Sequence, residues 1–311
     1  MGNSVGSPKS TGMKKRTKKL IFCLALITLP LIQFVIFYIG VNLNSIKLAF
    51  WEFNGTLDET GHFIGFKNFA TVIDEIVNLG NWPILIRNSF AVWGLGLVLK
   101  LPLSIIISYF VYKSAKVGGL LKVILFAPSI ISVMILVMLY EFFVDTALPV
   151  ILQRFFSVNL EMSLFKDPGL RFWTIYAYGF LTGFGVGLLL YTNAMSSISE
   201  SIVESAHLDG VNYIQEFWYI TLPMIFPTLK TLFVVGFTGI LTDQFGLFEF
   251  YGMTAPTDIQ TVGYYIFKET ILVGPDKYPR LSAMGIIVTC VAVPMTLLAR
   301  YLLNKVDPME V

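Results

Sequence analysis

The stretch that decides the fold is SISESIVESAHLDGVNYIQEFWYITLPMIFP, residues 197–227. It lies between two long apolar runs and has the signals of a helix, a break and a second helix. Ser201 and Glu204 have the spacing of a capping box, which satisfies the free amides at a helix start. Gly210 predicts the break, because glycine enters the left-handed conformation without a Cβ penalty.

The second short helix has signals of its own. Asn212 and Gln215 are suited to cap its start, and Pro223 and Pro227 predict its far end. One face of the predicted pair is apolar, and the other carries the carboxylates of Glu200, Glu204, Asp209 and Glu216. A helix that lies on a membrane usually presents basic residues to anionic lipid, and this stretch has none before Lys230. The acidic face therefore favours a protein partner with basic groups.

The composition indicates a polytopic membrane protein. Of the 311 residues, 55% are hydrophobic and only 14% are charged, which is too apolar for an ordinary soluble domain. The net charge of +2 is too small to favour a nucleic-acid partner. Cys23 and Cys290 both fall in apolar runs, so we expect neither a disulfide nor a metal site.

Six apolar segments have the length of a membrane span. They follow a basic tail, residues 1–19, that we expect to be mobile and cytoplasmic. The first segment is too long for a signal peptide and lacks a small-residue cleavage site, so we interpret it as a retained span. The predicted spans are residues 20–41, 89–112, 120–144, 172–195, 229–250 and 281–303.

Lysine and arginine are concentrated in the segments that six spans would place on the side of the tail. The positive-inside rule therefore predicts a multi-pass protein of the plasma membrane with both termini in the cytoplasm. The stretch 197–227 falls on the same side.

Nine positions of this stretch resemble the EAA loop of ABC-importer permeases, E-A-A-x-x-D-G-A followed by F-x-x-I-x-L-P-x-x-x-P: Glu204, Ala206, Asp209, Gly210, Phe217, Ile220, Leu222, Pro223 and Pro227. Ser205 and Val211 stand where the family has alanine. In that family the loop is a coupling helix, seated in a cleft of a cytoplasmic ATPase subunit. The resemblance implies this role for Glu204, Ser205, Ala206, Asp209, Gly210 and Phe217.

Two further segments resemble permeases of the maltose and glycerol-phosphate group. Residues 65–69, GFKNF, resemble the G-L-x-N-F/Y element after the first span. Residues 245–267 resemble the group's F-x-x-x-x-x-L-T-x-G-G-P stretch, although the T-x-G-G-P core is reduced to Thr254-Ala255-Pro256. The resemblance covers residues 20–305.

The resemblance implies the type I ABC importer permease fold, an all-α membrane protein with six transmembrane helices and a cytoplasmic helix-turn-helix loop. It also implies the partners: a second, non-identical permease, two ABC ATPase subunits and an extracellular solute-binding protein. The substrate would be a sugar or oligosaccharide. A permease for another solute class, such as amino acids or phosphate, stays open.

The sequence contains no glycine-rich phosphate loop with a Lys-Ser/Thr ending, so we do not expect this chain to be an ATPase. ATP and Mg would be bound by the partner subunits, and the assembled complex would hydrolyse ATP. His62 and His207 are predicted on opposite sides of the membrane and indicate no metal or catalytic site. An ion-coupled carrier is a second alternative, but it needs ionisable residues along an ion path, and only Lys100 lies near the middle of a span.

Lys100 has two interpretations, because a charge at mid-span must face protein or water. It contacts an acidic or hydroxyl-rich solute, or it binds carbonyl groups freed at Pro102 or an acid of the partner subunit. We favour the structural interpretation.

Sugars are commonly held by aromatic faces and amides, which gives the candidates Tyr178, Asn193, Phe237 and Gln244. Most aromatic residues of membrane helices pack or form the interfacial belt, and we assign Trp173 and Tyr176 to that belt. The glycines at 179, 183, 185 and 187 predict close approach of neighbouring helices.

Overall fold

The computed structural model describes residues 11–52, 61–78, 80–114, 118–157 and 162–306. The chain divides into two compact units, Met1–Val72 with Gly274–Met284 and Ile73–Val273 with Gly285–Val311. The predicted tail 1–19 is helical from Thr11 onward, and its first ten residues lie outside the described ones. Lysine, arginine and methionine are good helix formers, which accounts for the extension of the apolar helix toward the N-terminus. The mobility and cytoplasmic location of the tail stay predictions.

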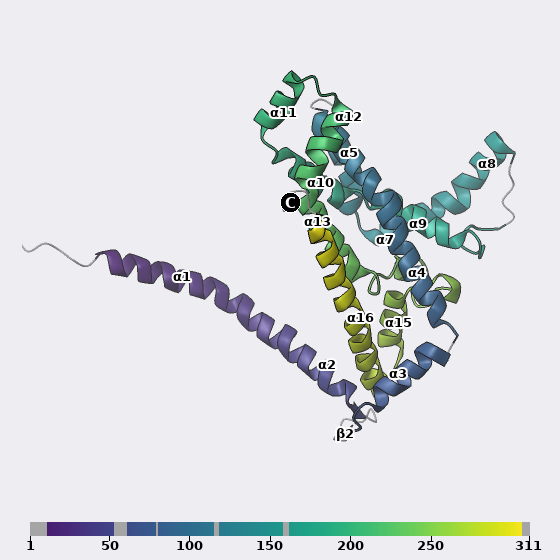
Figure 1. Ribbon diagram of the computed structural model, residues 1–311. Coiled ribbons are helices and arrows are strands. Elements are labelled where there is room, and N and C mark those ends of the chain that lie inside the picture. Colours follow the sequence, from purple (N-terminus) through teal and green to yellow (C-terminus); the bar gives the residue numbers. More distant parts are fainter. Residues whose placement is uncertain (1–10, 53–60, 79, 115–117, 158–161, 307–311) are drawn as a thin grey trace, which may run out of the picture. The chain divides into compact units, whose positions relative to one another are not determined.

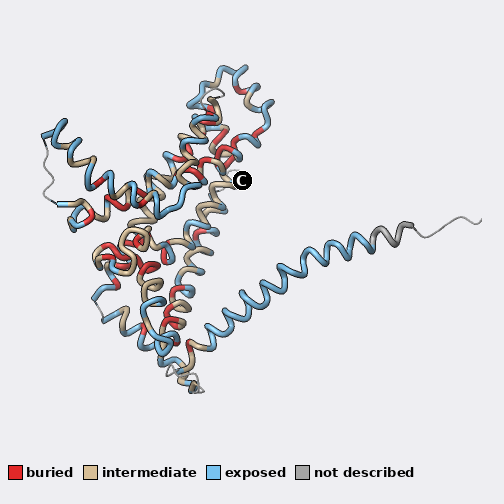
Figure 2. Tube along the Cα trace, turned by 180° about the vertical axis from the view of Figure 1, so that it is seen from behind, coloured by how far each residue is buried: buried red, intermediate tan, exposed pale blue. Residues whose placement is uncertain are grey.

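The first unit is dominated by one long helix. It consists of α1 (Thr11–Gln33), the π-helical η1 (Phe34–Gly40) and α2 (Val41–Ala49). Within the unit, all its side chains from residue 17 to residue 47 are exposed, as the pale blue trace shows (Figure 2). The antiparallel strands β1 (Trp51–Glu52) and β2 (His62–Phe63) follow, and then α3 (Lys67–Asn78).

The GFKNF element, residues 65–69, ties the long helix to the start of α3. The Asn68 amide donates a hydrogen bond to the carbonyl oxygen of Trp51 at 2.9 Å. The Phe50 ring packs on the Phe69 ring at a centroid distance of 5.1 Å. This element therefore has a structural role that its sequence resemblance did not reveal.

The second unit is a helical bundle in which α5 packs along α10, and α10 also contacts α6 and α13 (Figure 1). Its elements up to the fourth apolar segment are α4 (Trp82–Leu95), η2 (Gly96–Lys100), α5 (Leu101–Lys113), α6 (Gly118–Phe126), η3 (Ala127–Ser129), α7 (Val133–Phe142), η4 (Phe143–Ala147), α8 (Leu148–Phe156), α9 (Arg171–Thr182) and α10 (Gly185–Ser196). The remaining elements are α11 (Glu200–Leu208), α12 (Tyr213–Glu216), η5 (Phe217–Thr221), α13 (Leu222–Gly239), α14 (Leu247–Tyr251), η6 (Thr257–Ile259), α15 (Val262–Leu272) and the part of α16 (Tyr278–Lys305) from Gly285 onward. The short η7 (Pro275–Lys277) and the start of α16 belong to the first unit.

Five helices are long and apolar enough to cross a membrane among the described residues, and a bent pair makes six. The bent pair is Arg171–Thr182 and Gly185–Ser196, which meet at 41°. The five are Thr17–Ala49, Trp82–Lys113, Val133–Phe156, Tyr213–Gly239 and Pro275–Lys305. The all-α fold with up to six spans is as predicted, but two helices do not follow the predicted bounds.

The third predicted span, 120–144, is not one helix. The helix from Gly118 ends at Phe126, a short 3₁₀ turn contains Pro128, and a new helix begins at Val133. Proline removes a backbone donor and clashes with the preceding turn, and Ser132 is extended, with ψ at 130°. The long apolar helix is therefore residues 133–156.

The fifth predicted span, 229–250, is displaced toward the N-terminus. The helix runs without interruption from Tyr213 to Gly239 and is followed by a turn and the short α14. Pro223 and Pro227 lie inside it, so the prediction that they end the second short helix was wrong. The helix that follows Gly210 is continuous with the membrane helix.

Three prolines are accommodated in their helices by a preceding π-helical turn. Pro102, Pro149 and Pro223 each follow a five-residue π-helical segment, η2, η4 and η5. The residue before each proline donates its N–H to the carbonyl five residues earlier, for example Leu222 to Phe217. The wider turn gives room where the proline ring would meet a carbonyl, so the helix continues.

Two buried clusters hold the second unit together. One gathers Val144, Phe165, Ile175, Phe245, Leu247, Ala255, Ile259 and Tyr264, and joins α9 to the chain that follows α13. The other gathers Ile105, Tyr191, Met195, Ile198 and Ile225, and joins α5, α10 and α13. Apolar contacts therefore fix both ends of the bundle.

Candidate functional site

The helix pair predicted from residues 197–227 lies at the end of α5 and α10 (Figure 1). The first helix, α11, ends with a Schellman motif: Val211 N–H donates to Ala206 at 3.0 Å, and Gly210 N–H to His207 at 3.1 Å. Gly210 has a φ of +82°. The predicted break with a positive φ at Gly210 is confirmed.

The caps of the two helices differ. The predicted capping box of Ser201 and Glu204 was wrong, because the N-cap residue of α11 is Ser199, two residues before Ser201, and it forms no side-chain cap. The predicted cap of the second helix is confirmed: Asn212 and Gln215 form a reciprocal capping box with hydrogen bonds of 2.9 and 3.0 Å. A hydroxyl and an acid three residues apart do not fix where a helix starts when another serine is available nearby.

The residues assigned to coupling lie on different faces. Glu204, Ser205, Asp209 and Gly210 are exposed, whereas Ala206 is buried and Phe217 is half-buried. The Phe217 ring packs on Tyr109 of α5, with ring centroids 5.0 Å apart. Large apolar side chains of the pair are also exposed: Leu208, Tyr213, Ile214, Trp218 and Tyr219. The pair therefore presents a mixed acidic and apolar surface.

Glu216 does not belong to this acidic surface. Its side chain is fully buried, 2.5 Å from the Lys113 ammonium and 3.3 Å from Nε2 of His207. The prediction that Glu216 projects with the other carboxylates was wrong, because it faces α5 rather than the solvent.

The second unit also contains a cavity of about 520 Å³ between α4, α5, α9, α10 and α13. This volume is in the usual range of small-molecule pockets, about 300–1,000 Å³. Aromatic walls come from Trp93, Tyr176, Tyr178, Phe180, Tyr191, Phe233 and Phe245, and polar groups from Ser89, Lys100, Ser104, Asp243 and Thr261. Such a combination suits a hydroxyl-rich solute.

Two of the five predicted pathway residues, Tyr178 and Lys100, line the cavity. The other three do not. Asn193 is on the exposed side of α10, and Phe237 packs on Trp93, with ring centroids 4.7 Å apart. The carbonyl of Gln244 accepts the Leu247 N–H at 3.1 Å in the turn after α13.

Several residues that line the cavity were not predicted from the sequence. Tyr176, assigned to the interfacial belt, lines the cavity, and so do Trp93 and Asp243. A signal for the α4–α5 wall was present: Ser89, Trp93, Lys100 and Ser104 recur at helical spacing on one face of an otherwise apolar helix.

Lys100 is anchored in the bend between α9 and α10. Its ammonium donates to the carbonyl oxygen of Gly179 at 3.2 Å, in the last turn of α9. Carbonyls at a helix end lack intrahelical donors and attract cations. The interpretation that Lys100 binds carbonyls freed at Pro102 was wrong, because the carbonyl it binds belongs to the fourth apolar segment. Its contact with a solute stays a prediction. The carboxylate of Asp243 also attracts this ammonium.

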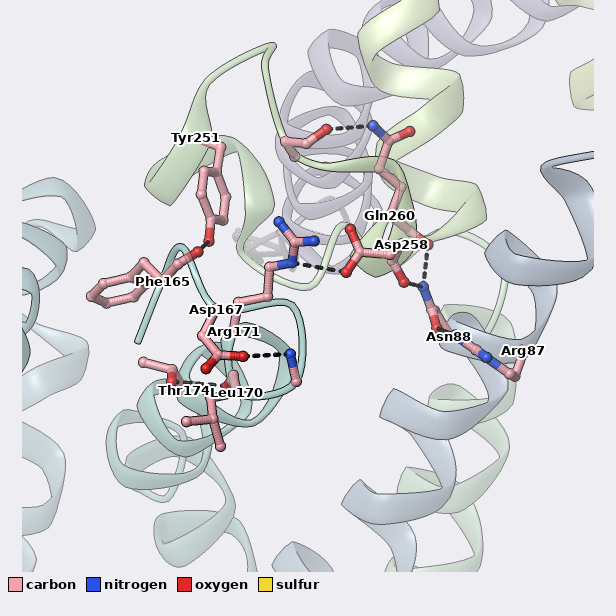
Figure 3. Close-up of polar contacts among 12 residues, drawn as sticks. Arg87, Asn88, Phe165, Asp167, Leu170, Arg171, Thr174, Tyr251, Asp258 and Gln260 are labelled. Carbon is pink, nitrogen blue, oxygen red and sulfur yellow. Dashed lines mark hydrogen bonds and ion pairs between the residues drawn. The ribbon is translucent and has the colours of Figure 1, made fainter. Parts of the chain in front are cut away.

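The segment from Pro256 to Thr261 is fixed by polar contacts to two helices (Figure 3). The Asn88 amide of α4 donates to the carbonyls of Asp258, at 2.7 Å, and Gln260, at 3.0 Å. Arg171 of α9 pairs with the Asp258 carboxylate at 2.8 Å. The segment thus bridges the helices that carry two walls of the cavity.

The same segment closes one side of the cavity. The Thr261 hydroxyl, a wall residue, donates to the carbonyl of Asp243 at 2.7 Å. The Tyr264 hydroxyl donates to Gly252 at 2.8 Å and accepts the Ala255 N–H at 3.1 Å. Burial raises the pKa of this phenol, and its hydrogen bond with Ala255 offsets part of the rise. The turn that replaces the glycine-rich core of related sequences is therefore held by a tyrosine.

The fold and its two sites define a helical membrane protein. It has a cavity between its helices and an exposed helix pair, and α13 connects the two. The chain belongs to the family described as binding-protein-dependent transport system inner membrane component, whose model matches residues 100–308. It is thus a multi-pass inner-membrane protein, and the predicted resemblance to ABC permeases is confirmed.

Similar proteins agree with this family. The chain is 29% identical over 259 residues to a probable ABC transporter permease protein of Mycoplasma pneumoniae, covering 80% of this chain and 75% of that protein. It is 24% identical over 223 residues to the sn-glycerol-3-phosphate transport system permease protein UgpA of Yersinia pestis, covering 71% of this chain and 74% of that protein.

A solved structure shows the same fold. It is the crystal structure of a bacterial ABC transporter involved in the import of the acidic polysaccharide alginate. The TM-score is 0.77 with 22% sequence identity, over 95% of this chain and 99% of the matched chain. A related crystal structure holds that type of transporter in complex with an alginate pentasaccharide-bound periplasmic protein, with a TM-score of 0.77 and 21% identity, over 94% of this chain and 98% of the matched chain.

Proposed function

We propose that this chain is one of two non-identical permease subunits of an ATP-driven importer for a sugar or oligosaccharide. Two cytoplasmic ATPase subunits would bind ATP and Mg, and an extracellular solute-binding protein would deliver the substrate. Both termini would lie in the cytoplasm. The family and the substrates of the similar proteins support this proposal.

One structural observation carries the proposal. The helix Tyr213–Gly239 begins in the exposed helix pair and ends at the cavity, where Leu232, Phe233 and Gly236 line the wall. A rigid helix conveys displacement along its axis, so movement of the pair changes the cavity directly. This is the mechanical arrangement that alternating access driven by an ATPase requires.

The helix pair is the proposed docking surface for an ATPase subunit. Glu204, Ser205 and Asp209 offer acceptors for basic side chains, and Gly210 sets the angle of the two helices. Leu208 and Tyr219 are 89% and 78% exposed, which is unusual for such large apolar side chains and supports a protein partner. Ala206 and Phe217 would support the surface from below.

The cavity is the proposed solute site. Tyr178, Trp93 and Tyr176 provide aromatic faces, and Ser104, Asp243 and Lys100 provide groups that hydrogen-bond hydroxyls. Lys100 would in addition attract an acidic group of a solute, because its ammonium carries two further donors beside the one directed at Gly179.

Purification of the tagged chain from its native membrane tests the proposal, with the co-purifying proteins identified by mass spectrometry. We expect an ABC ATPase, a second permease and a binding protein whose ligand is a sugar. Uptake assays with that binding protein in liposomes then follow the solute. A binding protein loaded with an amino acid or phosphate would overturn the sugar assignment, and ion-driven uptake without an ATPase would overturn the importer assignment.

A further inference from the structure

Among the four carboxylates of the helix pair, all of which the structure describes, only Glu216 is buried. Its side chain is 0% exposed, whereas Glu200, Glu204 and Asp209 are exposed. A carboxylate is removed from water only where other charges and polar groups replace its hydration. The groups around Glu216 therefore indicate its role.

Each oxygen of the carboxylate faces a different helix. Oε1 lies 2.5 Å from the ammonium of Lys113, in the last turn of α5. Oε2 lies 3.3 Å from Nε2 of His207, in the last turn of α11. Because Glu216 itself ends α12, one side chain joins the two helices of the pair to a membrane helix.

The Lys113 ammonium is held in a pocket of aromatic rings. It lies 5.2 Å from the ring centroid of Tyr112 and 5.9 Å from those of Tyr109 and Tyr213. Aromatic faces attract the cation, and the Lys113 side chain is only 21% exposed. These contacts hold the Lys113 ammonium beside Glu216, so the ion pair has a fixed position in the fold.

The connection leads to the cavity by a route separate from α13. Lys113 ends the continuous helix Trp82–Lys113, whose Lys100, Leu101 and Ser104 line the cavity wall. The helix pair is thus joined covalently to α13, which lines one part of the cavity, and is joined to α5 through the ion pair of Glu216. A movement of the helix pair can therefore displace both α13 and α5, which line the cavity.

We propose that the Glu216–Lys113 ion pair transmits movement of the helix pair to α5, and so makes the α5 wall of the cavity move together with α13. This positioning role rests on the proposed importer function. Without the ion pair, the remaining contacts would transmit less of the movement to α5, and ATP hydrolysis would continue with less solute carried.

Other contacts keep α5 beside α12 when the charges are removed. The Tyr109 hydroxyl donates to the carbonyl of Tyr213 at 2.9 Å, and the Tyr109 ring packs on Phe217. Replacing both members of a buried pair leaves no uncompensated charge, unlike the loss of one partner. The double variant Lys113→Gln with Glu216→Gln therefore suits the test.

The assay uses the full complex in liposomes with its loaded binding protein, and measures solute uptake and ATP hydrolysis together. We expect the double variant to assemble and to hydrolyse ATP, with uptake per ATP reduced by about tenfold, as for residues that carry coupling between sites. The conservative variant Lys113→Arg, which keeps a cation among the rings of Tyr109, Tyr112 and Tyr213, should keep most of the ratio. Lys305→Gln is the matched control, because Lys305 is also a lysine in the last turn of a long apolar helix, over the ring of Tyr301.

A parental ratio in the double variant, or a loss in the Lys113→Arg variant as large as that in the double variant, overturns the role of the Glu216–Lys113 ion pair. A complex that fails to assemble in the double variant but assembles with Lys113→Arg shows a role in assembly only, and also overturns the proposal. Failure of the parent to take up solute with ATP contradicts the proposed function itself, so the two failures are distinguishable.

Discussion

Lys100 occupies the space that a side chain at position 183 would need. A Cβ atom built on Gly183 meets the Lys100 ammonium and lies 2.5 Å from the carbonyl oxygen of Gly179. The bend of the fourth apolar segment, the lysine and the glycine are therefore parts of one arrangement. The prediction of close helix approach holds for Gly185, whose Cβ would lie 3.0 Å from the Leu125 carbonyl, and for Gly183, which Lys100 of a neighbouring helix contacts. It does not hold for Gly179 or Gly187, where no other helix lies within 4 Å of an added Cβ.

Gly183→Ala should destabilise the bend, because the new methyl group cannot avoid a backbone carbonyl. Overpacking of this kind costs about 1–3 kcal/mol. We expect a lower midpoint of thermal unfolding for the purified complex in detergent. Gly179→Ala is the control in the same segment, since nothing lies within 4 Å of its added Cβ. Equal midpoints for the two variants would contradict the arrangement.

Gly210→Val should separate ATP hydrolysis from uptake. The glycine has a φ of +82° and no neighbour within 4 Å of an added Cβ, so the variant suffers backbone strain rather than a clash. The left-handed conformation costs an ordinary residue about 1–2 kcal/mol, and a β-branched residue avoids it. Uptake per ATP measures the effect. Gly210→Asn, which tolerates this conformation, should retain coupling, and equal loss in both variants would assign the effect to something other than φ.

Glu204→Gln should weaken assembly with the ATPase subunit. The structure gives Glu204 no part in capping α11, so its charge rather than its hydrogen-bonding shape is what a basic cleft would recognise. Glu204→Ala should therefore behave like Glu204→Gln. The amount of ATPase that co-purifies with the tagged permease is the measurement, and a Gln variant that retains the ATPase while the Ala variant loses it would refute the charge contact.

Tyr178→Ala should impair solute binding, because Tyr178 lines the cavity. Loss of an aromatic contact of this kind raises KM by about tenfold, as a truncated binding residue costs more than about 1 kcal/mol. Asn193→Ala is the comparison in the same segment, on a residue that faces away from the cavity. Uptake against solute concentration yields both KM values, and a larger rise for Asn193 would remove the cavity as the solute site.

The orientation of the chain is testable with accessibility tags. We expect a tag at Ser114, beside the helix pair, to report the cytoplasm, and tags at Asp167 and Asp276 to report the outer face. Labelling of single cysteines by a membrane-impermeant reagent measures this in intact cells, after Cys23 and Cys290 are replaced by serine. A cytoplasmic signal from Asp167 would break the six-span topology and with it the docking role of the helix pair.

The sequence by itself determined the class of the fold and one of the two sites. Apolar segments of spanning length require helices, because backbone groups in a bilayer have no other donors or acceptors. The break at Gly210 and the cap at Asn212 depend on residues close in the chain, so local chemistry was sufficient to predict both.

Only the tertiary structure decided how apolar runs divide into helices and which polar groups meet. The run that contains Pro128 breaks, while the one that contains Pro223 continues, because a π-helical turn precedes the second proline alone. Glu216 looked like its exposed neighbours until α5 brought Lys113 to it. Tyr178 and Asn193 were equivalent candidates until packing turned one toward the cavity and the other away. Burial and ion pairs depend on residues far apart in the chain, and a one-dimensional pattern does not record which of them come together.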